Sequence, residues 1–430
     1  MKRLKKLVPI FLALLIILHC KIILANTNDL VTYSPTCLLV ESKTGKIIYE
    51  KNAYEKCYPA STTKIMTAIL TLEYCKLTDV ATASYEAVFS VPVGYTNANI
   101  QVGEELTINQ LLHVLLIQSA NEAANVLAEH IAGSVESFST MMNSKAVELG
   151  CLNTNFVNPN GVHNTNHYST AYDLSLIGRY AMQNETFRQI VATTIYTLPA
   201  SNKYPKNDRV FATTNPLLRE NSSDKVDNYY YEYATGIKTG YTNPAKNCIV
   251  ASSEKDGIEY IVVILGAGTT ENGLSARNLD CKTLFNYAFE NYTVKTLHEG
   301  NSTLKSIKIP KASSSTKNLN IIVENEISVL VKKDSADFAN ITPTVELNSD
   351  LHAPITQNTV IGKITYTIDG NEYTSKLLAG ANVLESNGIT TFLSIASILI
   401  VLFLLNKLLG SNNKNKKKRR RQKYKKRVLK

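Results

Sequence analysis

The sequence predicts an α/β (α+β) domain, followed by a small all-β domain and one membrane-spanning helix. Residues 36–51 alternate between apolar and polar as strands do, and strands reappear over 247–254 and 258–266, whereas the segment between has the periodicity of helices. After about residue 293 the chain becomes a series of short β-branched segments separated by turn residues. From Ile389 to Leu405 it carries no charge. These observations set the fold class and the order of the domains.

The first domain is expected over residues 26–291. It opens with a hairpin over 36–51 that turns at Thr44-Gly45. A helix begins at Ser61, and Thr107 is placed to cap a second helix. Further helices are expected over 122–132, 135–149, 171–183 and 274–290, and strands over 247–254 and 258–266. Because strands stand at both ends and helices between them, we expect an antiparallel sheet built from both ends, beside a helical subdomain.

The second domain is expected over residues 292–380. Its predicted strands are 303–309, 319–324, 327–333 and 359–366. Asp369-Gly370 is typical of the tight turn of one more hairpin. Residues 380–388 are predicted to form a short polar linker.

Both ends of the chain have the patterns of export and membrane anchoring. Residues 1–25 combine a basic start with a short apolar run, which predicts a secretory signal peptide; an uncleaved anchor is the alternative. Residues 389–409 predict a transmembrane anchor, at the short limit for a span, and a surface helix is the alternative. The basic tail 410–430 would stay cytoplasmic, so the folded domains would lie on the extracellular face of the cell membrane.

The charge distribution excludes one class of partner. The formal net charge is +10, but 18 of the 46 basic residues lie outside residues 26–385. The body holds the other 28 and all 36 acidic residues, a net charge of −8, so we predict no nucleic-acid partner. The six cysteines after residue 25 permit disulfides in an exported chain, and their spacing is not that of a zinc site.

A Ser-x-x-Lys motif stands at Ser61–Lys64. Similar strings begin at Ser222, Ser302, Ser314 and Ser411, so the sequence context must choose among them. Ser61 is the copy at a predicted helix start, where backbone N–H groups and the positive helix end favour a developing anion. Lys64 lies one turn further on the same face, and a lysine with a lowered pKa can take the proton of a serine hydroxyl.

A second motif, Ser119-Ala120-Asn121, falls between two apolar helices. Such a connection can present a hydroxyl and an amide to a cleft. Taken alone, the motif is better explained as a turn between two helices, with Ser119 and Asn121 as caps.

The third motif is Lys238-Thr239-Gly240, at the end of an alternating segment that predicts a strand. Lys238 and Thr239 can bind a substrate carboxylate, and Gly240 would leave room for the substrate backbone. A second Lys-Thr-Gly string, Lys43–Gly45, lies in the predicted hairpin turn and is explained by turn chemistry.

Together the motifs resemble those of the low-molecular-weight penicillin-binding proteins, the serine-type D-Ala-D-Ala carboxypeptidase family. Ala120 is small, as is usual in this family, where class A β-lactamases have aspartate. The segments Asn158–Val162, His167–Asp173 and Thr213–Asn215 also look like those of the family. The resemblance covers about residues 30–290 and implies a β-lactamase/transpeptidase-like catalytic domain.

The resemblance implies a mechanism in which Ser61 attacks the terminal D-Ala-D-Ala bond of a peptidoglycan pentapeptide. Lys64 would be the general base, and Ser119 would pass the proton to the departing D-alanine. Removal of this D-alanine from the stem peptide would limit the cross-linking of peptidoglycan. Backbone N–H groups of Ser61 and Tyr241 would form the oxyanion hole. A β-lactam would acylate Ser61 in the same way, and no metal or organic cofactor is implied.

The remaining site residues would bind and orient the substrate. Lys238 and Thr239 would hold the carboxylate of the departing D-alanine, beside Gly240. Asn121 would hold Lys64 or the substrate amide. His167 is expected to serve in packing or hydrogen bonding near the cleft, because the serine and lysine pair needs no histidine base.

Three other functions stay open at this point. A β-lactamase shares the motifs, but the deacylating glutamate of class A enzymes has no counterpart in a Glu-x-x-Leu-Asn string here. A D,D-endopeptidase or transpeptidase could use the same site. A catalytically idle peptidoglycan-binding protein would be expected to have lost at least one motif.

Overall fold

The computed structural model describes residues 30–31, 33–220, 229–333, 341–368, 370–386, 388 and 392–407. The chain divides into two compact units, Met1–Thr293 and Val294–Lys430. The predicted signal peptide 1–25 and the basic tail 410–430 lie outside the described residues.

The first unit is built on a five-stranded antiparallel sheet with strand order β2-β1-β9-β8-β7. The strands are β1 (Thr36–Glu41), β2 (Ile47–Lys51), β7 (Ala234–Thr242), β8 (Lys246–Lys255) and β9 (Ile258–Ala267). β1 pairs with β9 from Thr36 opposite Leu265 to Glu41 opposite Tyr260. Strands from the two ends of the domain therefore share one sheet, which confirms the expected architecture.

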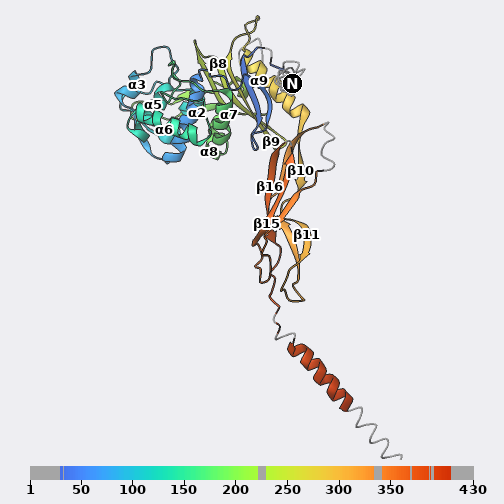
Figure 1. The fold of residues 1–430 in the computed structure, drawn as a ribbon. Helices are drawn as coiled ribbons and strands as arrows, with labels where there is room; N and C mark the ends of the chain where they lie inside the picture. Colours follow the sequence, from blue (N-terminus) through green and yellow to red (C-terminus); the bar gives the residue numbers. More distant parts are fainter. Residues whose placement is uncertain are drawn as a thin grey trace, which may run out of the picture. The chain divides into compact units, whose positions relative to one another are not determined.

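Helices cover both faces of this sheet (Figure 1). α7 (Ala171–Ala181) packs against β1 and β9, α8 (Glu185–Ala192) against β7, and α9 (Ala276–Asn291) against β8 and β9. Neighbouring residues of a strand point to opposite faces. Accordingly, Ile261 faces Gly178 of α7, whereas the Tyr260 ring lies 4.9 Å from that of Phe289 in α9.

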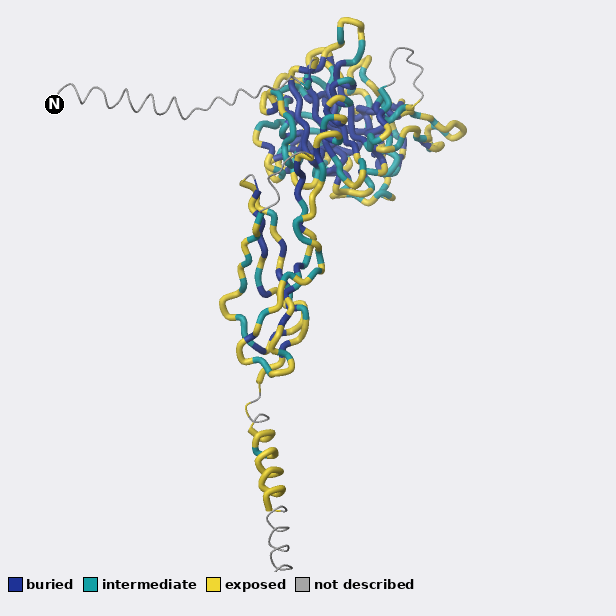
Figure 2. The backbone as a smooth tube through the Cα atoms, turned by 90° about the vertical axis from the view of Figure 1, so that its right-hand side faces the viewer, coloured by how far each residue is buried: buried dark blue, intermediate teal, exposed yellow. Residues whose placement is uncertain are grey.

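The helical subdomain fills the segment between the first two strands and the last three. Its helices are η1 (Ala60–Thr63), α2 (Lys64–Tyr74), α3 (Tyr85–Phe89), α4 (Ile108–His113), η2 (Val114–Gln118), α5 (Asn121–Ala132) and α6 (Val135–Glu148). α2 is buried from Lys64 to Thr71, because helices surround it, and Figure 2 shows the buried interior of the unit. Thr107 caps α4 in a capping box with Gln110, as predicted.

Several short elements of the first unit were not predicted. They are β3 (Val80–Thr82), β4 (Glu105–Thr107), β5 (Ile195–Leu198), β6 (Arg209–Ala212), α3, α8 and η3 (Pro216–Leu218). β3 pairs with β4 and β5 with β6 in small two-stranded sheets. Each of these four strands has only three or four residues, which is too short for a clear periodicity.

The second unit begins with an all-β domain, as expected. A five-stranded sheet has the order β11-β12-β16-β15-β14, and β10 pairs with β13. The strands are β10 (Tyr292–His298), β11 (Ser302–Lys308), β12 (Asn318–Val323), β13 (Ile327–Lys332), β14 (Thr344–Leu347), β15 (Val360–Ile368) and β16 (Asn371–Ala379). β15 and β16 form the hairpin predicted at Asp369-Gly370.

The linker predicted over 380–388 is wrong up to residue 386, because this part of the chain is attached to the β domain. Val383 is buried and bridges to Ile355, and Ser386 donates its N–H to the carbonyl of Lys311. An apolar side chain inside a polar stretch attaches this segment to the β domain.

Beyond that segment, residues 392–407 form a helix with mostly exposed side chains (Figure 2). In the part of the chain that the structure describes, no helix is both long and apolar enough to cross a membrane. The predicted span 389–409 is not found as such, and both of its ends fall outside the described residues.

Candidate active site

A cleft of about 400 Å³ opens in the first unit between the start of α2, the loop before α5 and strand β7. Six of the eight residues predicted for the site line it: Ser61, Ser119, Asn121, Thr239, Gly240 and Tyr241. The other two, Lys64 and Lys238, are buried directly behind the lining. The structure therefore brings together residues that lie up to 180 positions apart in the chain.

Ser61 stands in the 3₁₀ turn η1, immediately before α2. The sequence predicted a helix start here, and the α-helix proper begins three residues later. Ala60, which precedes the serine, has a φ of 48°. A left-handed alanine is strained, and such strain is typical of functional sites.

Lys64 is fully buried, and its Nζ has three oxygen neighbours. It lies 3.0 Å from Ser61 Oγ, 2.8 Å from Asn121 Oδ1 and 2.5 Å from the carbonyl oxygen of Asn160. The two carbonyl oxygens can only accept hydrogen bonds. In the neutral amine they would take two of its hydrogens, so the lone pair is left facing the Ser61 hydroxyl.

The surroundings of Lys64 favour that neutral form. Burial lowers the pKa of Lys64 well below its ordinary value, and the charge of Lys238 lowers it further. The carboxylate of Glu122 acts in the opposite direction. A lysine with a lowered pKa is a competent general base at neutral pH.

The segment Asn158–Val162 presents the Asn160 carbonyl to Lys64. Asn158 Oδ1 accepts the N–H of Gly161 at 2.7 Å, and Asn160 Oδ1 accepts that of Val162 at 2.9 Å. Gly161 has a φ of 82°, and a side chain there would lie 1.9 Å from the carbonyl oxygen of Ala60. The Asn-Pro-Asn-Gly string is thus a turn that packs against the backbone of the nucleophile.

Ser119 and Asn121 flank a break between two helices, as the sequence predicted. Ser119 follows the π-helical turn η2 and has a φ of 67°, and α5 begins at Asn121. Asn121 Nδ2 donates to the Thr96 carbonyl at 2.8 Å, which orients its Oδ1 toward Lys64. Of the two partners proposed for Asn121, the structure shows the lysine.

Lys238 and Thr239 lie on β7, beside Thr214. Thr239 Oγ1 donates to Thr214 Oγ1 at 2.9 Å, and Lys238 Nζ lies 3.5 Å from the same oxygen. Burial first, and then the charge of Arg277, lower the pKa of Lys238 to about 7. Burying a positive charge without an opposite charge costs free energy. The Lys238 ammonium group is therefore well suited to bind a carboxylate.

Gly240 packs against the chain itself, and the room that it was predicted to leave for the substrate stays a prediction. A side chain at this position would lie 2.9 Å from the Ser61 nitrogen and 3.1 Å from the carbonyl oxygen of Pro59. The space that a side chain would need is occupied by the chain itself, so the glycine allows β7 to pack against the backbone of Ser61. Next to it, the exposed Tyr241 donates its hydroxyl to Asn243 Oδ1 at 3.0 Å.

Arg277 is a cleft residue that the sequence did not indicate. It comes from the first turn of α9 and lines the cleft, although it is 9% exposed. Its Nη1 donates to the carbonyl oxygens of Cys248 at 3.0 Å and Gly240 at 3.3 Å. It adds a second positive charge near Lys238, and no local motif distinguishes it from other arginines.

His167 has the role expected from the sequence. It is buried, its Nδ1 accepts the N–H of Val157 at 3.2 Å, and its Nε2 lies 2.8 Å from Thr63 Oγ1. Burial lowers the pKa of His167 to about 4. The neutral ring thus ties η1 to the neighbouring loop by hydrogen bonds.

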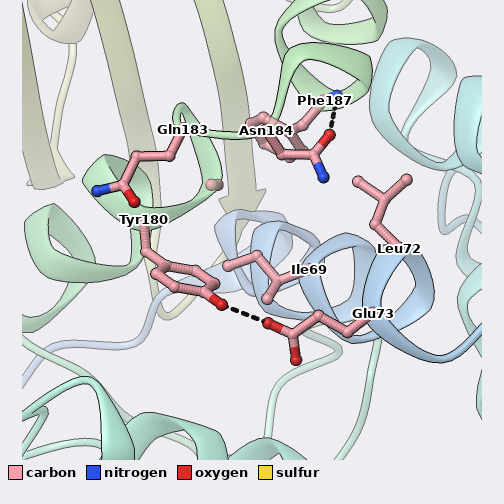
Figure 3. A pocket seen from close by; sticks show the side chains of 8 residues that line it. Ile69, Leu72, Glu73, Tyr180, Gln183, Asn184 and Phe187 are labelled. Carbon is pink, nitrogen blue, oxygen red and sulfur yellow. Dashed lines mark hydrogen bonds between the residues drawn. The ribbon is translucent and has the colours of Figure 1, made fainter.

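A second cavity, of about 220 Å³, lies between α2, α7 and α8 (Figure 3). The exposed surface of its lining is mostly apolar, and three of its polar side chains are already engaged in hydrogen bonds. Tyr180 donates its hydroxyl to Glu73 Oε1 at 2.6 Å, and Asn184 Oδ1 accepts the N–H of Phe187 at 3.0 Å. We therefore assign the active site to the larger cleft.

Comparison with known proteins agrees with this geometry. The family model described as D-alanyl-D-alanine carboxypeptidase matches residues 25–269. The chain belongs to the D-alanyl-D-alanine carboxypeptidase family. The model of the penicillin-binding protein 5 C-terminal domain matches residues 292–385, so this chain has the catalytic and all-β domains of that fold.

Relatives span most of the chain. The D-alanyl-D-alanine carboxypeptidase DacF of Bacillus subtilis is 31% identical over 86% of this chain and 90% of its own length. The solved D-alanyl-D-alanine carboxypeptidase DacD of Francisella tularensis is 26% identical, with a TM-score of 0.58 over 82% of this chain and 94% of that one. The solved DD-transpeptidase of Streptomyces K15 is 31% identical, with a TM-score of 0.53 over 60% of this chain and 97% of that one.

Proposed function

We propose that this chain hydrolyses the terminal D-Ala-D-Ala bond of peptidoglycan stem peptides through an acyl-enzyme on Ser61. The family and its named relatives support the activity. The observation that carries the residue assignment is the Lys64 environment. A fully buried amine lies 3.0 Å from the serine hydroxyl, with its other two neighbours being carbonyl oxygens.

In the proposed reaction Lys64 takes the proton of Ser61 as the oxygen attacks the carbonyl carbon. The N–H groups of Ser61 and Tyr241 would stabilise the oxyanion, an effect typically worth about 3 kcal/mol for each donor. Ser119 would deliver the proton to the nitrogen of the departing D-alanine. Water then releases the shortened peptide and restores the serine.

Lys238 and Thr239 would hold the carboxylate of the departing D-alanine. This part of the proposal is supported by the buried Lys238, which lies near the Thr214 hydroxyl that Thr239 also contacts, and by the buried Arg277, which lines the same cleft. A β-lactam carboxylate would occupy the same place, which explains why such a compound would acylate Ser61.

The test is the release of free D-alanine from a stem pentapeptide by the purified protein, with Ser61→Ala as the control. We expect D-alanine from the wild type and none from the variant. Cleavage of a cross-linked dimer without D-alanine release would favour the endopeptidase. Rapid turnover of a β-lactam would favour the β-lactamase, and peptide binding without any product would favour the idle binding protein.

We further propose that the chain is exported and anchored in the cell membrane. The support is in the sequence: residues 1–25 have the pattern of a signal peptide, 389–405 carry no charge, and the tail 410–430 is basic. The catalytic domain would then lie on the extracellular face. Recovery of the full chain in the soluble fraction of lysed cells would contradict the anchor.

A further inference from the structure

The start of α5 carries three polar side chains that are almost completely buried. Asn121, Glu122 and Asn125 have exposed fractions of 2%, 2% and 3%. Only Asn121 belongs to a motif. Buried polar groups destabilise a fold unless they form hydrogen bonds. The hydrogen-bond partners of Glu122 and Asn125 therefore indicate the roles of these two side chains.

Glu122 holds one wall of the cleft. Its Oε1 accepts the backbone N–H of Ala98 at 2.6 Å and that of Ile100 at 3.3 Å. These residues follow Gly94–Thr96, which line the cleft. The wall therefore depends on the carboxylate for its position.

Asn125 holds the other end of the same segment. Its Nδ2 donates to the carbonyl oxygen of Ala87 and to Ser90 Oγ, each at 3.1 Å. Its Oδ1 accepts from Asn160 Nδ2 at 3.0 Å, and the Asn160 carbonyl contacts Lys64. The cleft wall and the Lys64 amine are thus supported by the same two turns of α5.

Glu122 also has an oxygen with no partner. Among the residues that the structure describes, none forms a hydrogen bond with the buried Oε2. Burial raises the pKa of Glu122, whereas the N–H groups of Ala98 and Ile100 and the charge of Lys64 lower it. A neutral side chain could hold the wall equally well, so the charge calls for an explanation.

We propose that Glu122 is a positioning residue for the acyl transfer, which holds the cleft wall through Ala98 and Ile100 and acts on Lys64 through its negative charge. This inference rests on the proposed function, because it assigns Lys64 the role of base. Glu122 touches neither substrate nor nucleophile.

Among the residues that the structure describes, the charged and titratable groups that act on Lys64 come from three elements. Lys238 faces it from β7, His167 from the loop before α7, and Glu122 from α5. Glu122 is the one that favours the ammonium form. Without its charge the pKa of Lys64 falls further, and the free amine is present at lower pH. The acidic limb of the pH profile of acylation should then move to lower pH.

Two variants separate the two roles. Glu122→Gln keeps the carbonyl oxygen that accepts from Ala98 and Ile100 but removes the charge. Glu122→Ala removes both. Glu129→Gln is the matched control, since it removes a carboxylate two turns further along the same helix, where the side chain is partly exposed. The readout is the rate of acylation of the purified protein by a fluorescent penicillin across the pH range, with the melting temperature of each variant.

We expect the acidic limb of Glu122→Gln to move to lower pH, with that of Glu129→Gln in place. In Glu122→Ala the plateau rate should also fall by roughly tenfold or more, the size expected for losing hydrogen bonds to a charged group. A limb that stays in place in Glu122→Gln would overturn the inference, even if Glu122→Ala fails to fold. Absence of acylation in the wild type at every pH would instead overturn the proposed function.

Discussion

Replacing Lys64 by methionine is expected to reduce the acylation rate by about 10³-fold, within the usual range for general acid–base catalysis. Methionine keeps an unbranched apolar stem of nearly the same length but has no amine for the Ser61 proton. The change also removes the donor that contacts Asn121 and Asn160. The measurement is the rate of labelling by a fluorescent penicillin at saturating and limiting concentrations.

Two further substitutions show whether the loss concerns the base. The guanidinium group of arginine stays protonated and cannot act as a base. We therefore expect Lys64→Arg to reduce the acylation rate as much as Lys64→Met does. Lys145→Met removes another buried lysine, which lies outside the cleft and pairs with Glu73 at 2.8 Å and Glu148 at 2.9 Å. It should lower the melting temperature and leave acylation near that of the wild type. An active Lys64→Arg variant would contradict the assignment of the base.

Replacing Gly161 by alanine is expected to have the second largest effect. The added Cβ would lie 1.9 Å from the carbonyl oxygen of Ala60 and 3.0 Å from the nitrogen of Ser61, both rigid backbone atoms. Either the nucleophile or the Asn160 carbonyl must move, and a displacement of about 1 Å in an active site can reduce a rate by about 10²-fold. The measurement is the acylation rate, with the melting temperature recorded alongside.

Gly150→Ala is the matched control for the backbone conformation. Gly150 has a φ of 84°, close to the 82° of Gly161, but a Cβ there would meet only Leu176 at 3.9 Å. Both variants share the strain of a left-handed alanine, and only one has the clash. Equal acylation rates in the two variants would show that the contact between Gly161 and Ala60 does not matter.

The sequence was most informative where function depends on neighbours in the chain. Ser61 and Lys64 are three residues apart on a helix start, so their contact follows from helix geometry. The alternation around Lys238 predicted the strand β7, and the strands predicted over 247–254 and 258–266 form a hairpin that turns at Asp256-Gly257. Both turn residues indeed have positive φ, as a tight two-residue turn requires.

The parts that could not be predicted depend on tertiary contacts. Arg277 reaches the cleft from α9, and Glu122 acquires its partners only when the segment around Ala98 folds against α5. The reason for Gly240 was also out of reach, because the clash that excludes a side chain is with Pro59 and Ser61, about 180 residues away. Such contacts leave no periodicity in the chain.

The central claim is that Ser61 is the nucleophile of an acyl-enzyme. The most direct test is to incubate the purified protein with a fluorescent penicillin, measure the intact mass, and map the adduct by peptide digestion, beside a folded Ser61→Ala control. We predict one stable adduct, on the peptide containing Ser61, and none in the control. An adduct that maps elsewhere or persists in Ser61→Ala, or no adduct on folded wild-type protein, would contradict the account.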